Sequence, residues 1–237
     1  MPVIAVSNPK GGAGKSTTTL LLATYMAEHG ASVCIIDADP RQPMVFWQKQ
    51  GKTQSGVKIV GGVTEGTIMP TVDAQNDCQF VFIDLEGTQS VTVSRSIAIS
   101  DFVIIPVQAS PEDVRAAAAA IRTVVDEESI IRRSNPNKHI PYKVLLTRTN
   151  APGAPVSGIQ KQLEEELREA NLPIFKTQIA ERKAYKAIFL EGMTLSELKT
   201  HGLKVGNLET AQQNVADVSQ ELISYLEQAM PVEEVTK

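Results

Sequence analysis

Near the start of the chain lies a glycine-rich run with two lysines and two hydroxyl side chains, Lys10-Gly11-Gly12-Ala13-Gly14-Lys15-Ser16-Thr17. It follows the apolar stretch Val3-Ile4-Ala5-Val6 and precedes a helical pattern that begins at Thr18. A glycine-rich turn between a strand and a helix lets successive backbone N–H groups point at phosphate oxygens, and the helix N-terminus adds partial positive charge. The run therefore predicts a phosphate-binding loop, which we call the phosphate loop.

The side chains of the phosphate loop predict a nucleoside triphosphate with magnesium as the ligand. We expect Lys15 to reach the β- and γ-phosphates and Ser16 to bind the magnesium ion. The other loop positions that would hold the phosphates are Gly11, Gly12, Ala13, Gly14 and Thr17. The usual pattern has a glycine at the position of Pro9, and this chain instead carries a second lysine, Lys10, inside the loop.

Carboxylates follow two further apolar stretches. Asp37-Ala38-Asp39-Pro40-Arg41 comes after one of them, and Asp84 comes after Phe80-Val81-Phe82-Ile83. Because ligands of open parallel sheets lie beyond the carboxyl ends of the strands, we expect these carboxylates beside the phosphate loop. Asp84 would hold magnesium, usually through water. Each segment also has a structural alternative, since such aspartates are common in α/β proteins and can cap turns.

The three motifs and their order resemble the ParA/MinD family of ATPases, whose phosphate loop is the deviant Walker A motif K-G-G-x-G-K-[ST]. The resemblance extends from Val3 to about Gly192. It implies that Lys10 crosses a dimer interface to touch the phosphates of the partner's ATP. It also implies that Asp39 orients or activates the attacking water and that Asp37 supports the magnesium shell. The alternative for Lys10 is a solvated loop lysine.

The chain departs from the family pattern at two places beside this site. Arg41 stands where the family usually has glutamine, and Leu85-Glu86-Gly87-Thr88 replaces the usual D-T-P-P-G continuation. Glu86 is an extra carboxylate near the expected position of the γ-phosphate. Its roles in catalysis and in capping the following helix both stay open.

Two arginines are candidates for contacts to the base. The resemblance implies that Arg148, in the polar turn after an apolar strand, stacks on adenine. It further implies that the segment ending at Arg182 completes the adenine pocket and positions this arginine. In this segment Ala180 stands where the family usually has proline. Both arginines could equally be surface charges.

Short apolar stretches alternate with helical periodicity along the chain. The predicted strands are Val3–Ser7, Ser32–Asp37, Val57–Val60, Gln79–Asp84, Phe102–Val107, Tyr142–Thr147 and Ile174–Gln178. Such alternation predicts βαβ units. We therefore expect an α/β fold, a doubly wound and mostly parallel sheet with helices on both faces, in a single P-loop ATPase domain over residues 1–237.

The composition excludes several classes of protein. A formal net charge of −4 and a pI near 5.5 argue against a protein that clamps polyanions over its whole surface. Cys34 and Cys78 lack the C-x-x-C spacing of zinc or iron–sulfur sites. The sequence also has neither a signal-peptide pattern nor an apolar stretch long enough to span a bilayer. We therefore expect a cytoplasmic protein, nucleoid-associated when it binds ATP.

The resemblance implies a DNA partition ATPase for a plasmid or chromosome. Its ATP-bound homodimer would bind DNA non-specifically, and a ParB-like centromere-binding protein or another adaptor would stimulate slow hydrolysis. Accessories of conjugative DNA transfer, ATPases that position protein cargo, and metabolic P-loop synthetases remain alternatives. A MinD-type membrane switch is disfavoured, because the segment from Leu208 to Met230 contains no lysine or arginine.

Several basic residues near the end of the resemblance are candidates for contacts to DNA. They are Arg182, Lys183, Lys186, Lys199 and Lys204. Helical spacing would place Arg182 and Lys186 on one side of a helix. The alternative is a solvated charged face.

Overall fold

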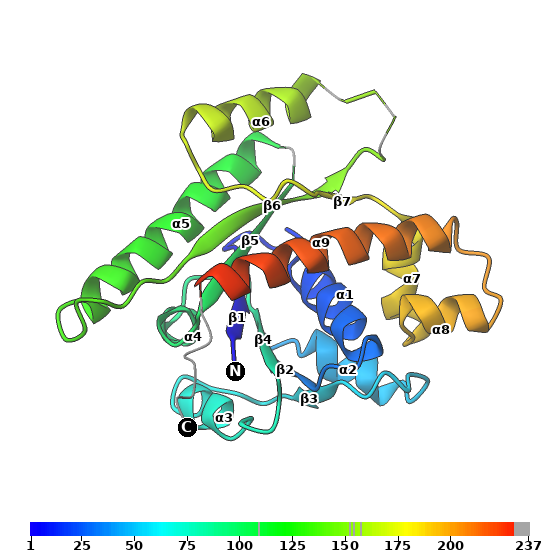
Figure 1. The fold of residues 1–237 in the computed structure, drawn as a ribbon, viewed down its shortest axis with the longest axis horizontal. Helices are drawn as coiled ribbons and strands as arrows, with labels where there is room; N and C mark the ends of the chain where they lie inside the picture. Colours follow the sequence, from blue (N-terminus) through cyan, green and yellow to red (C-terminus); the bar gives the residue numbers. More distant parts are fainter. Residues whose placement is uncertain (109, 152, 154, 157, 230–237) are drawn as a thin grey trace.

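The computed structural model describes residues 1–108, 110–151, 153, 155–156 and 158–229. Within these residues, one parallel sheet forms the centre of the protein, with the strand order β3-β2-β4-β1-β5-β6-β7 (Figure 1). The strands are β1 (Val3–Val6), β2 (Val33–Ala38), β3 (Lys58–Val60), β4 (Phe80–Leu85), β5 (Phe102–Gln108), β6 (Tyr142–Thr149) and β7 (Ile179–Ala180).

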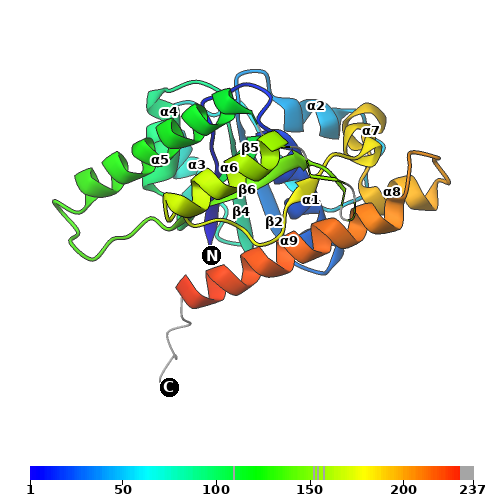
Figure 2. The same cartoon turned by 90° about the horizontal axis from the view of Figure 1, so that it is seen from above.

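Helices cover both faces of the sheet, as Figure 2 shows for α5 and α9 on opposite sides. The described helices are α1 (Lys15–Glu28), α2 (Pro43–Lys49), α3 (Ile68–Asp73), α4 (Val91–Ala98), α5 (Pro111–Ile131), α6 (Gly158–Glu169), α7 (Lys183–Glu191), α8 (Leu195–Thr200) and α9 (Leu208–Ala229). Side chains of α1, α2, α7, α8 and α9 form one apolar cluster with the sheet. Those of α3, α4, α5 and α6 form the other.

The sequence of β1 explains how one strand serves both clusters. Successive side chains of a strand point to opposite faces, so a strand covered on both sides must be apolar throughout. Ile4 and Val6 belong to the cluster of α1, and Val3 and Ala5 belong to the cluster of α5. The predicted doubly wound α/β fold is confirmed, and every strand pair in the described sheet is parallel.

The strand order places the predicted motifs at one edge of the sheet. β1 lies between β4 and β5, and β2 pairs with the other side of β4. In this register Asp84 is opposite Val6 of β1 and opposite Asp37 of β2. The phosphate loop and both carboxylate segments therefore leave the carboxyl ends of adjacent strands.

The predicted strand Ile174–Gln178 was wrong in its position. Its first residue forms only an isolated bridge to β6, and the strand at this edge is β7 instead. The backbone N–H groups of Lys176 and Thr177 donate to the carboxylate of Glu221 at 2.7 and 2.8 Å. These donors bind α9 and are not available to the sheet, so regular pairing begins only after them.

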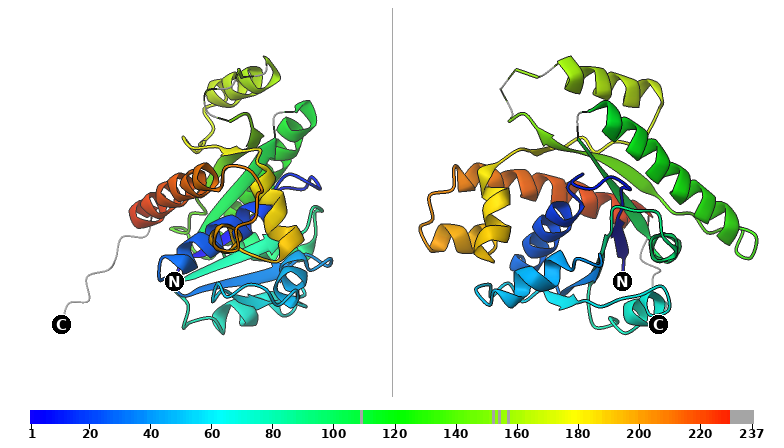
Figure 3. Two further views of the ribbon diagram at one scale, coloured as in Figure 1. Left: turned by 90° about the vertical axis from the view of Figure 1, so that its right-hand side faces the viewer. Right: turned by 180° about the vertical axis from the view of Figure 1, so that it is seen from behind.

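The long helix α9 packs against α1 along an apolar stripe. Its buried side chains include Ala211, Val215, Val218, Leu222 and Leu226. Seen from behind, α5 runs along the opposite face of the sheet (Figure 3). The stripe of α9 is therefore part of the core, while Met230 lies outside the described residues. Among the residues that the structure describes, no helix is long and apolar enough to cross a membrane.

Candidate nucleotide site

The phosphate loop connects β1 to α1 and leaves the N-terminus of that helix open. Gly12 and Gly14 have φ values of 80° and 101°, which are accessible to glycine without strain. Gly14 is the N-cap residue of α1, and no side chain caps the helix. The helix begins at Lys15, three residues earlier than predicted. The first backbone N–H groups of α1 are therefore available to an anion.

Polar side chains from β5, from β6 and from the segment after β1 hold the phosphate loop in place. The Thr147 hydroxyl donates to the Ala13 carbonyl at 2.9 Å, and the Asn8 amide donates to the Pro106 carbonyl at 2.7 Å. Gln108 also donates to the carbonyl of Gly12. Sequence reasoning missed these three polar residues. Their position at the carboxyl ends of predicted strands, beside the expected ligand, was a usable signal.

Lys15 is buried inside the loop. Its Nζ donates to the Asn8 carbonyl at 2.9 Å and to the Lys10 carbonyl at 3.2 Å. Burial lowers the pKa of Lys15, and the nearby charges of Asp84 and Asp39 oppose this shift. Solvent therefore contributes little to stabilising the ammonium group, which favours a strong interaction with an anion placed beside it.

Gly87 approaches the phosphate loop closely. A Cβ atom at this position would lie 3.1 Å from the Gly11 nitrogen and 3.3 Å from Lys15 Nζ. The segment that replaces the family's D-T-P-P-G continuation thus reaches the lysine, and Glu86 and Thr88 on either side line the same cavity.

Asp84 and Asp37 each present a buried carboxylate oxygen without a hydrogen-bond partner among the described residues, Asp84 Oδ2 and Asp37 Oδ1. Desolvation raises the pKa of Asp84 to about 7, and a hydrogen bond with Ser16 opposes the shift. The other oxygen of Asp37 accepts hydrogen bonds from Met44 N at 2.8 Å and Val45 N at 3.1 Å, at the start of α2. Unpaired buried carboxylate oxygens are the donor type that a magnesium ion or its bound water takes.

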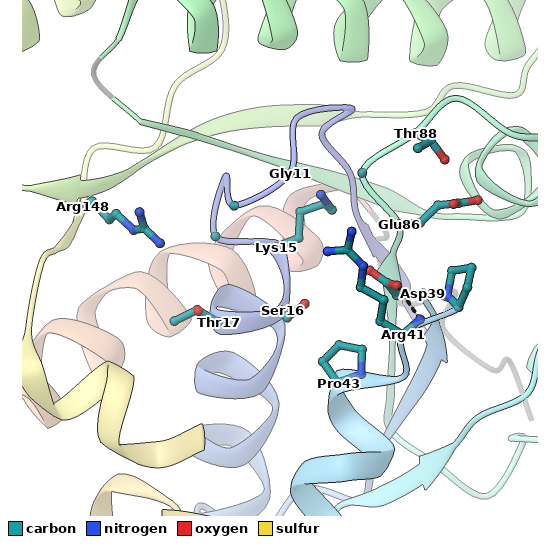
Figure 4. A pocket seen from close by; sticks show the side chains of 14 residues that line it. Gly11, Lys15, Ser16, Thr17, Asp39, Arg41, Pro43, Glu86, Thr88 and Arg148 are labelled. Carbon is teal, nitrogen blue, oxygen red and sulfur yellow. Dashed lines mark hydrogen bonds between the residues drawn. The ribbon is translucent and has the colours of Figure 1, made fainter. Parts of the chain in front are cut away.

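Asp39 and Arg41 form the turn between β2 and α2. Asp39 Oδ1 accepts a hydrogen bond from the backbone N–H of Arg41 at 2.8 Å, and the Asp39 carbonyl accepts one from Gln42 N at 2.8 Å. Figure 4 shows both side chains beside Lys15, in a cavity of about 350 Å³. The cavity is lined by Gly11, Gly12, Gly14, Lys15, Ser16, Thr17, Asp39, Pro40, Arg41, Pro43, Glu86, Gly87, Thr88 and Arg148.

Lys10 does not line this cavity. Its Nζ lies 2.8 Å from Asp113 Oδ2 and 3.5 Å from Glu112 Oε2, in the first turn of α5. The hydrogen bond with Asp113 raises the pKa of Lys10. The lysine predicted to reach a partner subunit is therefore held by its own subunit in this structure. Asp113 is a buried site residue that sequence reasoning missed.

A second, smaller cavity on the other side of the loop joins the two arginines predicted to contact the base. It is lined by Gly14, Thr17, Thr18, Thr147, Arg148, Ile179, Ala180, Glu181, Arg182, Tyr185 and Lys186. Arg148 lines both cavities and has a φ of 52°. Arg182 Nε and Thr18 Oγ1 are buried without hydrogen-bond partners among the described residues. A ligand in this cavity would meet an unpaired donor and an unpaired hydroxyl.

The candidate DNA contacts lie around α7 and α8. Lys186 pairs with Glu181 at 2.7 Å, and Lys199 pairs with Glu209 at 3.1 Å. Arg182 is the N-cap of α7 and has extended backbone, so it lies at the start of the helix and not within it. Arg182 and Lys186 line the same small cavity. In the described part of the chain, no ion pair engages Lys183 or Lys204, and both are exposed.

A model of the VirC1 protein family matches residues 1–228. The chain belongs to the VirC1 protein family. Protein ParA of Rhizobium radiobacter is 32% identical to this VirC1-family chain over 231 residues, covering 97% of the chain and 100% of the relative. Maintenance of carboxysome distribution protein A of Halothiobacillus neapolitanus is 25% identical over 202 residues, covering 84% and 88%. The apo structure of McdA from Cyanothece has a TM-score of 0.70 at 19% identity and covers 92% of this chain and 99% of that chain.

These comparisons confirm the resemblance to the ParA/MinD family. The VirC1-family protein is a ParA/MinD-type P-loop ATPase, related to partition and positioning proteins.

Proposed function

We propose that this VirC1-family protein binds ATP with magnesium, dimerises on it, and acts on DNA during partition. The observation that supports this most directly is the cavity at the carboxyl edge of the sheet. There the open N-terminus of α1, the ammonium of Lys15 and the aspartate segments after β2 and β4 come together. This combination suits a triphosphate with a hydrated divalent cation.

The residues present fit magnesium as well as phosphate. When bound, the cation would neutralise phosphate charge. Ser16 and Asp84 would hold it, and Asp37 would support its shell with the oxygen that α2 does not use. Among the described residues, no three or more His, Cys, Asp or Glu side chains group as a metal site of their own. Magnesium in nucleotide sites typically uses one or two carboxylates together with phosphates.

In this proposal Lys10 leaves Asp113 and contacts the nucleotide of a second subunit. A cation from the partner offsets phosphate charge that Lys15 alone does not neutralise, so ATP links the two subunits. Lys10 is suited to such an exchange because its side chain is 30% exposed, and one of its two carboxylate partners, Glu112, is itself 77% exposed.

Hydrolysis in this proposal is slow and depends on Asp39. Its carboxylate lines the cavity, and the hydrogen bond from the backbone of Arg41 sets its orientation. Asp39 would position the attacking water, and a ParB-like or other adaptor protein would accelerate the step. Glu86, which lines the same cavity, is the second candidate for this role.

The ATP-bound dimer would bind DNA without sequence preference, which is supported by the full-length similarity to a ParA protein. Of the five candidates, only Lys186 and Lys199 form described ion pairs. Lys183 and Lys204 are the exposed ones among the other three. Accessory action in DNA transfer is a second candidate function, supported by membership of the VirC1 family. Positioning of protein cargo is a third, supported by the relative that maintains carboxysome distribution.

Sedimentation velocity with a non-hydrolysable ATP analogue and magnesium tests the nucleotide switch. We expect dimers of the wild type with the analogue, monomers with ADP, and monomers of Lys10→Ala under both conditions. Lys15→Ala should lose nucleotide binding itself. A Lys10→Ala variant that dimerises as well as the wild type would refute the role of Lys10.

A gel shift on duplexes of unrelated sequence tests DNA binding. Binding should require the ATP analogue and fall steeply with salt, because each neutralised phosphate releases counterions. Lys183→Ala and Lys204→Ala should each reduce the salt slope by about one. Lys161→Ala on α6, which removes a lysine that pairs with Glu165, is the matched control. A confirmed dimer that shifts no duplex would favour the cargo or transfer-accessory function.

A further inference from the structure

We propose that Arg41 contacts the terminal phosphate of the nucleotide within its own subunit and makes the site distinguish ATP from ADP. The proposal rests on the proposed ATP binding and adds a residue to it. Arg41 stands where related proteins usually have glutamine, so this contact would be a property of this chain.

The turn that carries Arg41 is fixed at both ends. On one side, the Asp39 carboxylate and carbonyl accept hydrogen bonds from the backbone of Arg41 and Gln42, both at 2.8 Å. On the other, the Asp37 carboxylate accepts hydrogen bonds from two N–H groups at the start of α2. Hydrogen bonds at both ends of the turn fix the direction in which the exposed side chain of Arg41 leaves the backbone.

The helix behind this turn is also anchored. Trp47 of α2 is fully buried, and its indole N–H donates to the carbonyl of Ile188 in α7 at 2.9 Å. This bond and the burial of Trp47 hold α2, the helix that follows the turn, against α7. The backbone of Arg41 is therefore positioned before any ligand binds.

The side chain of Arg41 points toward Lys15. Figure 4 shows its guanidinium group on the same side of the phosphate loop as Lys15 and Asp39, whereas Arg148 lies on the opposite side. Lys15 and Arg41 both line the larger cavity. Two cations of one subunit thus face the same end of the cavity.

Arg41 has no ion pair with the carboxylates around it. Asp39 and Glu86 line the same cavity. However, no carboxylate oxygen among the described residues lies within 4.0 Å of a guanidinium nitrogen of Arg41, which is the limit for an ion pair. Asp39 Oδ1 accepts a hydrogen bond from the backbone N–H of Arg41, not from its guanidinium group. The guanidinium is therefore free to bind a phosphate without first breaking an internal salt bridge.

A guanidinium at this end of the cavity suits the terminal phosphate. Arginine offers planar, paired donors that match phosphate oxygens, and charge-assisted hydrogen bonds of this kind are among the stronger ones in proteins. Lys10 is held by Asp113 in the same subunit, so before dimerisation Arg41 would be the second cation on the terminal phosphate. ADP lacks that phosphate, so the contact would favour ATP.

Isothermal titration of ATPγS and ADP with magnesium tests the inference. The measurements use a Lys10→Ala background, because a monomer separates nucleotide binding from dimerisation. We expect Arg41→Gln to weaken ATPγS binding about ten- to hundredfold, the usual range for hydrogen bonds to charged groups, and ADP binding less than threefold. Arg41→Lys should keep part of the preference.

Arg148→Gln is the matched control, since it removes a guanidinium on the base side and should weaken ATPγS and ADP by the same factor. Equal melting temperatures of the variants without nucleotide would exclude a damaged turn. The inference fails if Arg41→Gln leaves the ratio of ATPγS to ADP affinity unchanged, whether both affinities fall together or neither changes. Absence of nucleotide binding by the parent protein would instead overturn the proposed function.

Discussion

Neutralising Asp113 should strengthen ATP-dependent dimerisation. In the monomer, Lys10 Nζ lies 2.8 Å from a carboxylate that is 1% exposed. If Lys10 must leave this carboxylate to reach the nucleotide of the partner, the ion pair opposes dimer formation. Asp113→Asn keeps the shape of the side chain and removes its negative charge. The ammonium group of Lys10 is then held less strongly in its own subunit and reaches the partner's nucleotide more readily.

The size of the effect follows from the geometry of the ion pair. Unit charges at this distance attract by about 6 kcal/mol at an effective dielectric constant of 20. Because the Lys10 side chain is 30% exposed, solvation of the free ammonium offsets most of this attraction. A net contribution of about 1–1.5 kcal/mol is reasonable for a charged hydrogen bond open to solvent. Two such pairs break per dimer, so the association constant should rise about 30- to 150-fold.

Sedimentation equilibrium with ATPγS and magnesium, over a range of protein concentrations, measures this constant. Glu112→Gln is the matched control, because its carboxylate is 3.5 Å from Lys10 Nζ and 77% exposed. We expect it to change the constant less than threefold. Asp113→Asn should also fail to restore dimers to Lys10→Ala. An association constant for Asp113→Asn equal to or below that of the wild type would refute the reasoning, because Asp113 would then not compete with the nucleotide for Lys10.

Two further predictions concern the carboxylates of the cavity. Asp39→Ala should bind ATP and dimerise but hydrolyse it at least a hundredfold more slowly in single turnover, through loss of the group that positions water; an unchanged rate would transfer this role to Glu86. Because burial raises the pKa of Asp84 to about 7 from an ordinary value of 3.8, the folded protein without magnesium should lose stability as pH rises from about 4 to 7. In urea titrations, Asp84→Asn should therefore raise the free energy of unfolding by roughly 2–4 kcal/mol at pH 8. At pH 4.5 the increase should be less than half of that. An equal increase at both pH values would contradict the assignment of the pKa shift to the Asp84 carboxyl.

Features that depend on neighbours along the chain were predictable. The phosphate loop follows from glycine spacing, since only glycine adopts the φ values of Gly12 and Gly14 without strain. The two-sided sheet follows from strands that are apolar throughout, because side chains alternate between its faces. Asp37 and Asp84 came next to each other because both end strands that are adjacent in a parallel sheet. In each case the local pattern and the general rule for such folds were enough.

Contacts between distant segments were decided by the tertiary structure. Lys10 and Asp113 are 103 positions apart, and no pattern around either residue indicates that the lysine turns away from the cavity. The predicted strand after Ile174 was wrong because Glu221, on a later helix, binds its backbone. The direction of Arg41 likewise depends on a turn held by hydrogen bonds to Asp37 and Asp39. Residue types and spacing specify which groups can form such contacts. Which contact forms depends on competition between possible partners, and these partners come together only once the chain has folded.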